Sequence, residues 1–172
     1  MADMAGKADQ MRTITLGAAR VTILNAGDAI FDLTEEMDIS ESERQTAGDG
    51  VFVGPALYPT QCVHIALPGA SVLVDACDYD RCFGPDSPNR PAGYTPLSLP
   101  EMLATLGVRP EDVTHVVLTH AHFDHFSGVT MARDGARVPV FPNARYYLGR
   151  GDWENEETQM ALREPGTLES DT

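Results

Sequence analysis

Residues 113–128 read Val-Thr-His-Val-Val-Leu-Thr-His-Ala-His-Phe-Asp-His-Phe-Ser-Gly. The first six residues form a β-branched, almost continuously apolar run, which is typical of a short strand buried on both faces. Directly after this run, His120, His122, Asp124 and His125 lie within six residues, and they include three of the five histidines of the chain. We therefore expect a buried strand whose far end presents a dense group of imidazoles and a carboxylate.

This group of four side chains has the chemistry of a metal site. Neutral imidazole and carboxylate are common ligands of zinc and other divalent metals. Side chains alternate along a strand, so His120 and His122 can point the same way, while the bend after the strand turns Asp124 and His125 onward. One pair can then serve each of two neighbouring ions, and two such ions can clamp a substrate oxygen and lower the pKa of a shared water. Without a cation, four such groups would be costly to bury unpaired.

Upstream of this cluster, the pattern predicts layered α/β packing. Ser98 is placed to cap a helix over residues 99–107, which Gly107 ends. Residues 61–67 and 70–75 predict a hairpin around Pro68-Gly69, with Asp75 at its far end. The other upstream expectations are strands over residues 13–16, 20–24 and 29–33, a solvated acidic segment over residues 34–49 with Ser40 capping a short helix, and a loop over residues 78–100, which contains five of the twelve prolines.

Downstream of the cluster, the sequence predicts strands over residues 138–141 and 144–148 and an acidic helix over residues 152–163. The expected domain organisation is a disordered leader over residues 1–12, one domain over residues 13–163 and a frayed tail over residues 164–172. The two histidines outside the cluster, His64 and His115, are expected to be ordinary core or surface residues.

The cluster resembles the signature of the metallo-β-lactamase superfamily, which is H-x-H-x-D-H after a short hydrophobic strand. All four positions match, at His120, His122, Asp124 and His125, and Val72-Leu73-Val74-Asp75 looks like the family's strand that ends in an aspartate. The resemblance covers about residues 13–153 and implies an α/β fold of the αββα sandwich type. It further implies that His120 and His122 hold one metal and that Asp124 and His125 hold the other. Asp75 would support the loop over residues 119–128, here called the metal loop, from behind these ligands.

By the same resemblance, the activity would be that of a metal-dependent hydrolase. Its cofactor would be Zn²⁺, two ions per complete domain, with Fe or Mn as alternatives. Hydroxide held by the two ions would attack an ester, a lactone or a related carbonyl of a small-molecule substrate, and Asp124 would also orient that nucleophile or accept its proton. Residues 141–147 and 152–154 look most like the branch of lactonases and organophosphate-ester hydrolases.

The sequence departs from the family pattern after the cluster. No histidine follows His125, whereas the family supplies two further histidines and a bridging aspartate from its C-terminal half, and Asp134, Asp152 and Asp171 do not stand in the context of that aspartate. The chain is therefore expected to be the N-terminal half of the domain, and a truncated record, a split gene and a decayed paralogue all fit. The rival hypothesis is a catalytically inactive fragment or binding module that retains half a metal site. For the chain alone, the sequence predicts weak zinc binding, no appreciable hydrolysis and self-association.

Composition excludes several other classes of protein. The chain of 172 residues has 12 Lys and Arg against 26 Asp and Glu, a net charge of −14, and no basic run, which argues against nucleic-acid binding. Its apolar runs fall far short of the roughly 20 residues that cross a bilayer, and we see no secretory signal pattern. The three cysteines, Cys62, Cys77 and Cys82, have no C-x-x-C spacing, so neither a disulfide framework nor a zinc knuckle is indicated and a reducing cytoplasm is the default expectation. A homo-oligomer is compatible with the sequence.

Overall fold

The computed structural model describes residues 11–32, 40, 42–43 and 54–163. Residues 1–10 of the predicted leader, the predicted tail and most of the acidic segment lie outside the described residues. In the part of that segment that is described, the Ser40 backbone amide donates to Glu43 Oε2 at 2.9 Å and the Glu43 amide donates to Ser40 Oγ at 3.4 Å. These reciprocal contacts match the expected cap of a short helix.

The elements follow the predicted order with several changes of boundary. The strands are β1 (Met11–Leu16), β2 (Ala19–Phe31), β3 (Ala56–Leu67), β4 (Ala70–Val74), β5 (His115–Val117), β6 (Thr130–Arg133), β7 (Ala136–Pro139) and β8 (Arg145–Tyr147). The helices are α3 (Tyr79–Cys82), α4 (Leu99–Thr105), the 3₁₀ turn η2 (Pro110–Asp112), α5 (Phe123–Phe126), α6 (Arg150–Glu154) and α7 (Glu156–Arg163).

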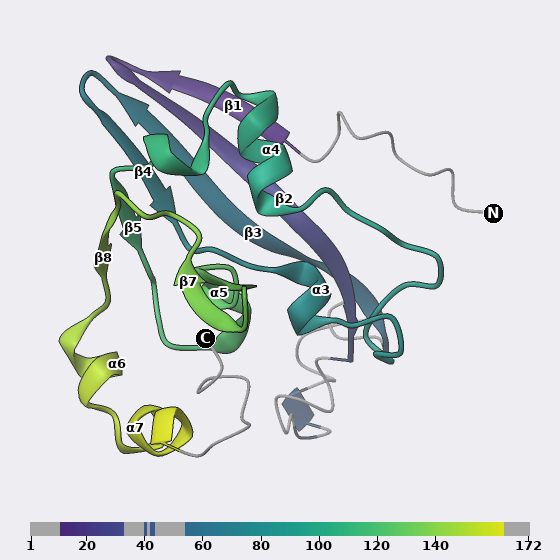
Figure 1. Cartoon of the computed structure of the whole chain (residues 1–172). Coiled ribbons are helices and arrows are strands. Elements are labelled where there is room, and N and C mark those ends of the chain that lie inside the picture. Colours follow the sequence, from purple (N-terminus) through teal and green to yellow (C-terminus); the bar gives the residue numbers. More distant parts are fainter. Residues whose placement is uncertain (1–10, 33–39, 41, 44–53, 164–172) are drawn as a thin grey trace.

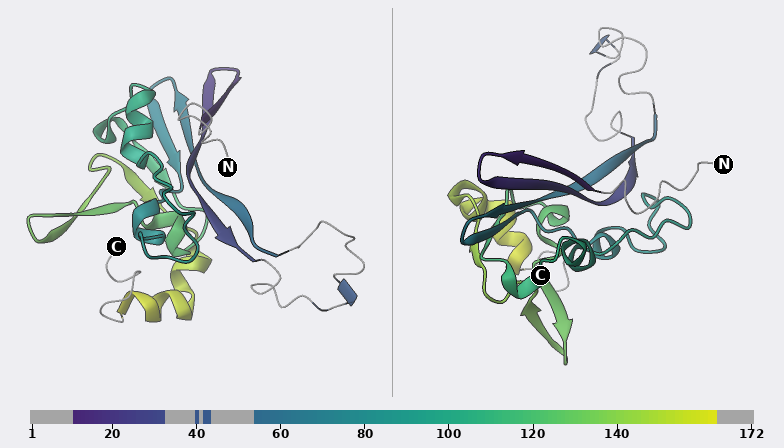
Figure 2. Two further views of the ribbon diagram at one scale, coloured as in Figure 1. Left: turned by 90° about the vertical axis from the view of Figure 1, so that its right-hand side faces the viewer. Right: turned by 90° about the horizontal axis from the view of Figure 1, so that it is seen from above.

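Six of the strands form one sheet in the order β1-β2-β3-β4-β5-β8 (Figure 1). Strands β1 to β4 pair antiparallel, whereas β5 runs parallel to both β4 and β8. The chain between β4 and β5 carries α3 and α4 on one side of this sheet, and the separate β6–β7 hairpin projects away on that same side (Figure 2). The mixed α/β class is thereby confirmed, with the predicted buried strand placed between two parallel neighbours.

Strand β2 corrects two sequence predictions. Residues 20–24 and 29–33 were expected to be separate strands, but β2 continues from Ala19 to Phe31 and pairs with β3 on both sides of a bulge between Asn25 and Gly27. The Asn-Ala-Gly stretch forms this bulge, in which the Asn25 side chain accepts the Gly27 amide at 3.1 Å. Strand β1 also begins at Met11, two residues before the predicted start of the domain.

Three further elements differ from the predictions. The proline-rich loop contains one helical turn, α3, which Asp78 caps by accepting the Arg81 amide at 3.3 Å. The single acidic helix is instead α6 and α7, because Asn155 adopts an extended conformation and its side chain caps the second helix, accepting the Glu157 amide at 2.9 Å. The predicted strand over residues 138–141 is shifted to β7, and its partner β6 was not predicted.

The core lies between the sheet and α4. The cap predicted for this helix is present, since the Ser98 amide donates to Glu101 Oε2 at 2.8 Å. Met102 and Leu103 are fully buried against the sheet, where Leu73 and Val116 are also fully buried. Burying side chains of this size contributes about 1.5–3 kcal/mol each. The core thus packs α4 against the sheet that contains β4 and β5, the two strands that lead to the histidine cluster.

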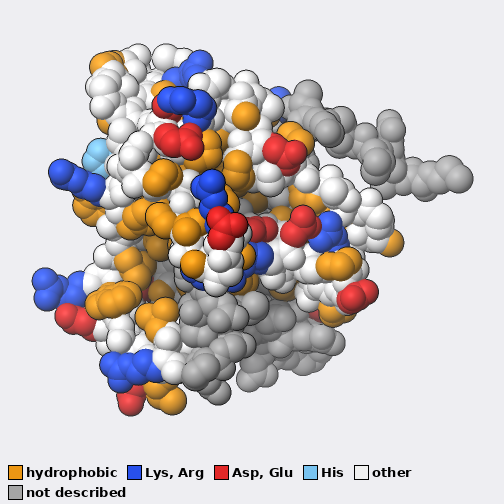
Figure 3. Space-filling model, viewed as in Figure 1, with side chains coloured by type: hydrophobic (Ala, Val, Ile, Leu, Met, Phe, Trp, Pro, Cys, Tyr) orange, Lys and Arg blue, Asp and Glu red, His pale blue; other side chains and the backbone are white. Residues whose placement is uncertain are grey.

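The opposite face of the sheet keeps apolar side chains in solvent. Ile23, Leu67 and Tyr147 are 38%, 42% and 46% exposed. In a sandwich two sheets pack face to face, so this is the face that a second sheet would cover. On the side shown in Figure 3, by contrast, acidic and basic side chains are interspersed around groups of hydrophobic ones. No helix in the described part of the chain is long and apolar enough to span a membrane.

Candidate metal centre

The ends of two parallel strands bring Asp75 and the histidine cluster together. Val74 of β4 is paired with Val117 of β5, and the Asp75 amide continues this ladder by donating to the Val117 carbonyl at 2.9 Å. Asp75 has a left-handed backbone with φ of 58°, which aspartate tolerates better than most residues. Its carboxylate accepts the Thr119 amide at 2.8 Å and the Thr119 hydroxyl at 2.9 Å. The carboxyl ends of parallel strands are where α/β sheets usually place their sites.

Asp75 also contacts His125, the last histidine of the cluster. His125 Nδ1 lies 2.9 Å from Asp75 Oδ2, although the two residues are 50 positions apart. Burial would raise the pKa of Asp75, but the hydrogen bonds from His125 and Thr119 hold it below its ordinary value. In return, the hydrogen bond to Asp75 raises the pKa of His125. Nδ1 of His125 contacts Asp75, and the other ring nitrogen, Nε2, lies 3.5 Å from Asp124 Oδ2.

The other two cluster histidines lie against His125. The His120 ring is centred 4.0 Å from the His125 ring and 4.6 Å from the His122 ring. Burial, together with His125 and His122, lowers the pKa of His120, which favours its neutral form. His120 Nδ1 lies 3.0 Å from the Thr119 hydroxyl. The structure therefore gathers three imidazoles and one carboxylate at one point, as the spacing in the sequence predicted.

The side chains of the cluster are of the types that bind divalent metals, but they do not form a complete metal site. Neutral imidazole and carboxylate suit zinc, and a histidine backed by a carboxylate through its second nitrogen is the usual arrangement around a ligand histidine. Across residues 11–32, 40, 42–43 and 54–163, however, no group of three or more His, Cys, Asp or Glu side chains is arranged to hold a metal ion. A catalytic zinc normally has three protein ligands. The described residues thus provide side chains of the kind that bind zinc, but not the three-ligand arrangement of a catalytic zinc site.

Two residues that follow the cluster were missed in the sequence. The Ser127 hydroxyl accepts the Asp78 amide at 2.8 Å, and the Gly128 amide donates to the Ala76 carbonyl at 2.8 Å. A Cβ atom at Gly128 would lie 3.0 Å from that same carbonyl oxygen. The end of the metal loop is therefore packed against the backbone that follows β4, and the glycine was the one available signal for this close approach.

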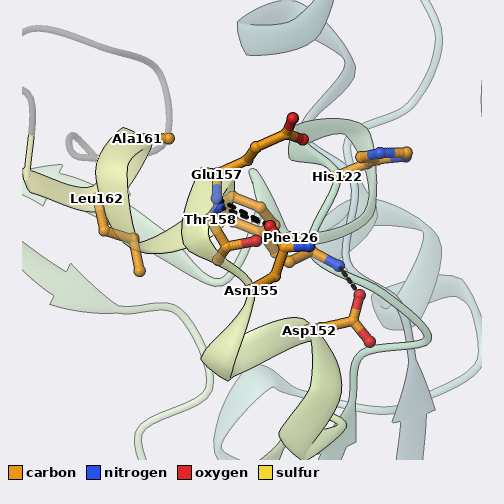
Figure 4. A pocket seen from close by; sticks show the side chains of 9 residues that line it. His122, Phe126, Asp152, Asn155, Glu157, Thr158, Ala161 and Leu162 are labelled. Carbon is orange, nitrogen blue, oxygen red and sulfur yellow. Dashed lines mark hydrogen bonds between the residues drawn. The ribbon is translucent and has the colours of Figure 1, made fainter.

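The position of Asp152 was also not predicted from the sequence. It lies on α6 and accepts the Ala121 amide at 3.2 Å, in the middle of the metal loop. Beside this contact is a recess of about 240 Å³ with His122 at its rim (Figure 4). It is lined by Ala121, His122, Phe126, Asp152, Asn155, Glu157, Thr158, Ala161 and Leu162. The helices that the sequence merged into one thus form a wall next to the cluster.

The two remaining histidines lie outside the cluster, as expected. His64 is 1% exposed within β3, where its Nε2 is 2.9 Å from the Ser71 hydroxyl. His115 is half-buried on β5 and stacks on Tyr147, with ring centres 5.9 Å apart. Within the described part of the chain, neither ring contacts a ring of the cluster or forms a hydrogen bond with it.

Comparison with known proteins agrees with this geometry. The family model described as the metallo-beta-lactamase superfamily matches residues 84–169, half of the chain and the whole of the cluster. The chain belongs to the metallo-beta-lactamase superfamily. The mixed α/β fold described above is the fold of this superfamily.

Several members of the superfamily resemble the chain over most of its length. It is 32% identical over 155 residues to the N-acyl homoserine lactonase AiiB of Agrobacterium fabrum, an alignment that covers 84% of the chain and 52% of that lactonase. The solved structure of AidC, described as a dizinc quorum-quenching lactonase, matches 94% of the chain and 54% of AidC with a TM-score of 0.63 at 21% identity. The hydrolase AbOPH matches 93% of the chain and 54% of its own with a TM-score of 0.59 at 20% identity. The chain spans about half the length of the relatives it matches.

Proposed function

We propose that this chain contributes to the metal centre of a hydrolase that cleaves an ester or a lactone in a small-molecule substrate. One observation carries the proposal: His120, His122, Asp124 and His125 converge at the end of β5, with His125 held from behind by Asp75 at 2.9 Å. The names of AiiB and AidC, both lactonases, support lactones as the substrate class.

In this proposal His120 and His122 hold one divalent cation and Asp124 and His125 hold a second. Zinc suits these donors best, and iron or manganese are the alternatives. Such ions would supply polarisation of the substrate carbonyl and a water that loses its proton near neutral pH. The carboxylate of Asp124 orients the attacking group or takes up its proton. Asp75 keeps the His125 ring turned so that Nε2 faces the cluster.

The recess beside His122 is the proposed place for the substrate. Phe126, Ala161 and Leu162 give it an apolar wall, while Asp152 holds the Ala121 amide at its edge (Figure 4). A small ester or lactone with a hydrocarbon substituent can lie against such a wall while its carbonyl faces the histidines.

A joined protein tests the proposed activity. We would fuse the chain to the part of AiiB that the alignment leaves uncovered, and measure bound zinc together with hydrolysis of an N-acyl homoserine lactone. We expect two zinc ions per molecule and turnover from the fusion, and weak zinc binding without turnover from the 172-residue chain. A fusion that is folded and fully loaded with zinc but inert toward lactones and esters would contradict the proposal.

A second candidate is a catalytically inactive fragment or binding module with half a metal site. It is favoured because, within the described residues, no group of three or more His, Cys, Asp or Glu side chains is arranged to hold a metal ion. The coding region after codon 172 separates the two candidates. An open frame that encodes a further histidine, an aspartate and a last histidine supports the hydrolase, whereas a native stop codon directly after Thr172 supports the inactive module.

Removing the Asp75 carboxylate should weaken metal binding. We expect Asp75→Ala to lower zinc affinity roughly 10- to 100-fold, because His125 would lose the partner that fixes its ring. Asp75→Asn should lose less, since asparagine also tolerates the left-handed backbone and can still accept the Thr119 amide. Competition with a chromophoric chelator measures both variants, and Asp86→Ala, an exposed aspartate of the following loop, is the matched control. Unchanged affinity in Asp75→Ala would show that this carboxylate only shapes the turn.

A further inference from the structure

The fold brings together two cysteines that the sequence leaves unpaired. Cys77 follows β4 and is 1% exposed, and Cys82 is the last residue of α3 and is partly exposed. Their sulfur atoms lie 3.8 Å apart. The third cysteine, Cys62, is buried on β3, and its sulfur accepts the Cys77 amide at 3.3 Å. A spacing of five residues has no meaning as a motif, but the turn at α3 makes the two thiols neighbours.

Cys82 also joins α3 to the end of the metal loop. Its sulfur is 3.1 Å from the Ser127 hydroxyl, the same hydroxyl that accepts the Asp78 amide at 2.8 Å. The Arg81 guanidinium donates to the Ser127 carbonyl. Ser127 therefore receives contacts from three residues of one short segment, and it stands two positions after His125.

We propose that Cys77 and Cys82 are an oxidisable dithiol that closes to a disulfide and thereby releases the contact between Cys82 and Ser127. Forming the bond requires the sulfurs to approach from 3.8 Å to about 2.05 Å. The movement falls on the end of α3, because Cys77 is anchored in the core by Cys62. The oxidised chain then holds the end of the metal loop through fewer contacts.

Cys77 and Cys82 differ in pKa and in exposure, as expected for one thiol that reacts with the oxidant and a second thiol that then completes the disulfide. The hydrogen bond from the Cys77 thiol lowers the pKa of Cys82, which makes Cys82 the more readily ionised sulfur. The same bond, with burial, raises the pKa of Cys77. Because Cys82 is also the more exposed of the two, it is the sulfur that meets an oxidant first, and Cys77 is the one that resolves it.

Hydrogen peroxide is the oxidant in this step. The Cys82 thiolate attacks one peroxide oxygen, the O–O bond breaks, and the leaving hydroxide takes a proton to become water, which leaves a sulfenic acid on Cys82. The Cys77 sulfur then attacks the Cys82 sulfur, the S–O bond breaks, and the hydroxide leaves with the Cys77 proton as a second water. Two thiols are oxidised by two electrons in total, and one peroxide is reduced to two waters.

Peptide mapping of the full chain tests the pair directly. The reduced protein is treated with hydrogen peroxide, alkylated in denaturant and digested with trypsin. Cleavage after Arg81 separates Cys82, in residues 82–133, from Cys62 and Cys77, in residues 45–81. We expect the two peptides to become linked within the monomer, with Cys62 alone still alkylated, and a thiol reductant to restore all three alkylated cysteines. The readout counts cysteines, so oxidation of methionines does not disturb it.

Single substitutions identify the partners. Cys62→Ala is the matched control and should retain the link, whereas Cys77→Ala and Cys82→Ala should lose it. Hydrogen exchange of the Asp78 amide, which Ser127 accepts, should become faster on oxidation of the wild-type chain. The proposal is overturned if all three cysteines stay alkylated, if the link joins Cys82 to Cys62, or if Cys82 is oxidised to a sulfinic acid while Cys77 remains a free thiol. None of these readouts depends on hydrolase activity.

Discussion

Replacement of His120 or His122 by alanine is expected to lower zinc affinity by about 100-fold or more. Loss of a residue that only supports a ligand typically costs 10- to 100-fold, and loss of a ligand itself should exceed that. The two rings lie 4.6 Å apart and belong to the same half of the proposed centre. Each substitution would leave a single protein ligand on that ion, which is too few to hold zinc against water.

Zinc titration in the presence of a chromophoric chelator measures this effect, on the chain and on the fusion with AiiB. His115→Ala is the matched control, because the imidazole it removes lies on β5, stacks on Tyr147 and is outside the cluster. A fall in affinity of the control equal to that of the two variants would indicate general damage to the fold. Unchanged zinc binding in both variants would exclude the proposed ligand assignment.

Gly27→Ala is expected to destabilise the fold by about 2–3 kcal/mol. A Cβ atom at this position in the β2 bulge would lie 2.2 Å from Cδ2 of Tyr79. That ring cannot easily move away, since it is 4% exposed, donates its hydroxyl to the Asp28 carbonyl at 2.6 Å, and packs 5.1 Å from the ring of Phe83. Either the bulge would have to open or α3 would have to shift, and both changes would disturb the segment that supports the metal loop.

Thermal or urea unfolding of the chain measures this loss, for which we expect a fall in the melting temperature of roughly 4–12 °C. Gly151→Ala is the control, because a Cβ atom there meets no other atom within 4 Å. Truncating the ring in Tyr79→Ala should make the Gly27 substitution nearly neutral, so a double-mutant cycle isolates the clash. If Gly27→Ala costs as much without the ring as with it, backbone strain and not contact with Tyr79 limits this position.

The histidine cluster was predictable because its parts are local in the chain. His120, His122, Asp124 and His125 fall within six residues, so a strand followed by a bend already places them together. The capped helix over residues 99–105 and the hairpin around Pro68-Gly69 were predictable for the same reason. For Asp75, the residues of the metal loop were the expected partners from the sequence, and the structure selects Thr119 and His125. The roles of these residues in binding metal stay predictions until zinc is measured.

The wrong secondary-structure predictions arose where one local sequence pattern is compatible with two structures. Asn25 to Gly27 looks the same in a sequence whether the chain turns or bulges, and only pairing of β2 with β3 on both sides decides for the bulge. Asn155 within an acidic, helical pattern was overlooked as a break, although its side chain caps α7. The short strand β6, which was not predicted, depends on its partner β7 more than on its own composition.

The sequence by itself thus determined the superfamily, the α/β class and the identity of the four candidate ligands, because each of these rests on residue types at short fixed spacings. Only the tertiary structure decided which distant residues meet the cluster. Asp75 reaches His125 because β4 and β5 are parallel neighbours, and Cys82 reaches Ser127 because α3 folds back over the end of the metal loop. Contacts of this kind are set by strand pairing and core packing, which act between segments 40 or more positions apart and leave no periodic trace in the sequence.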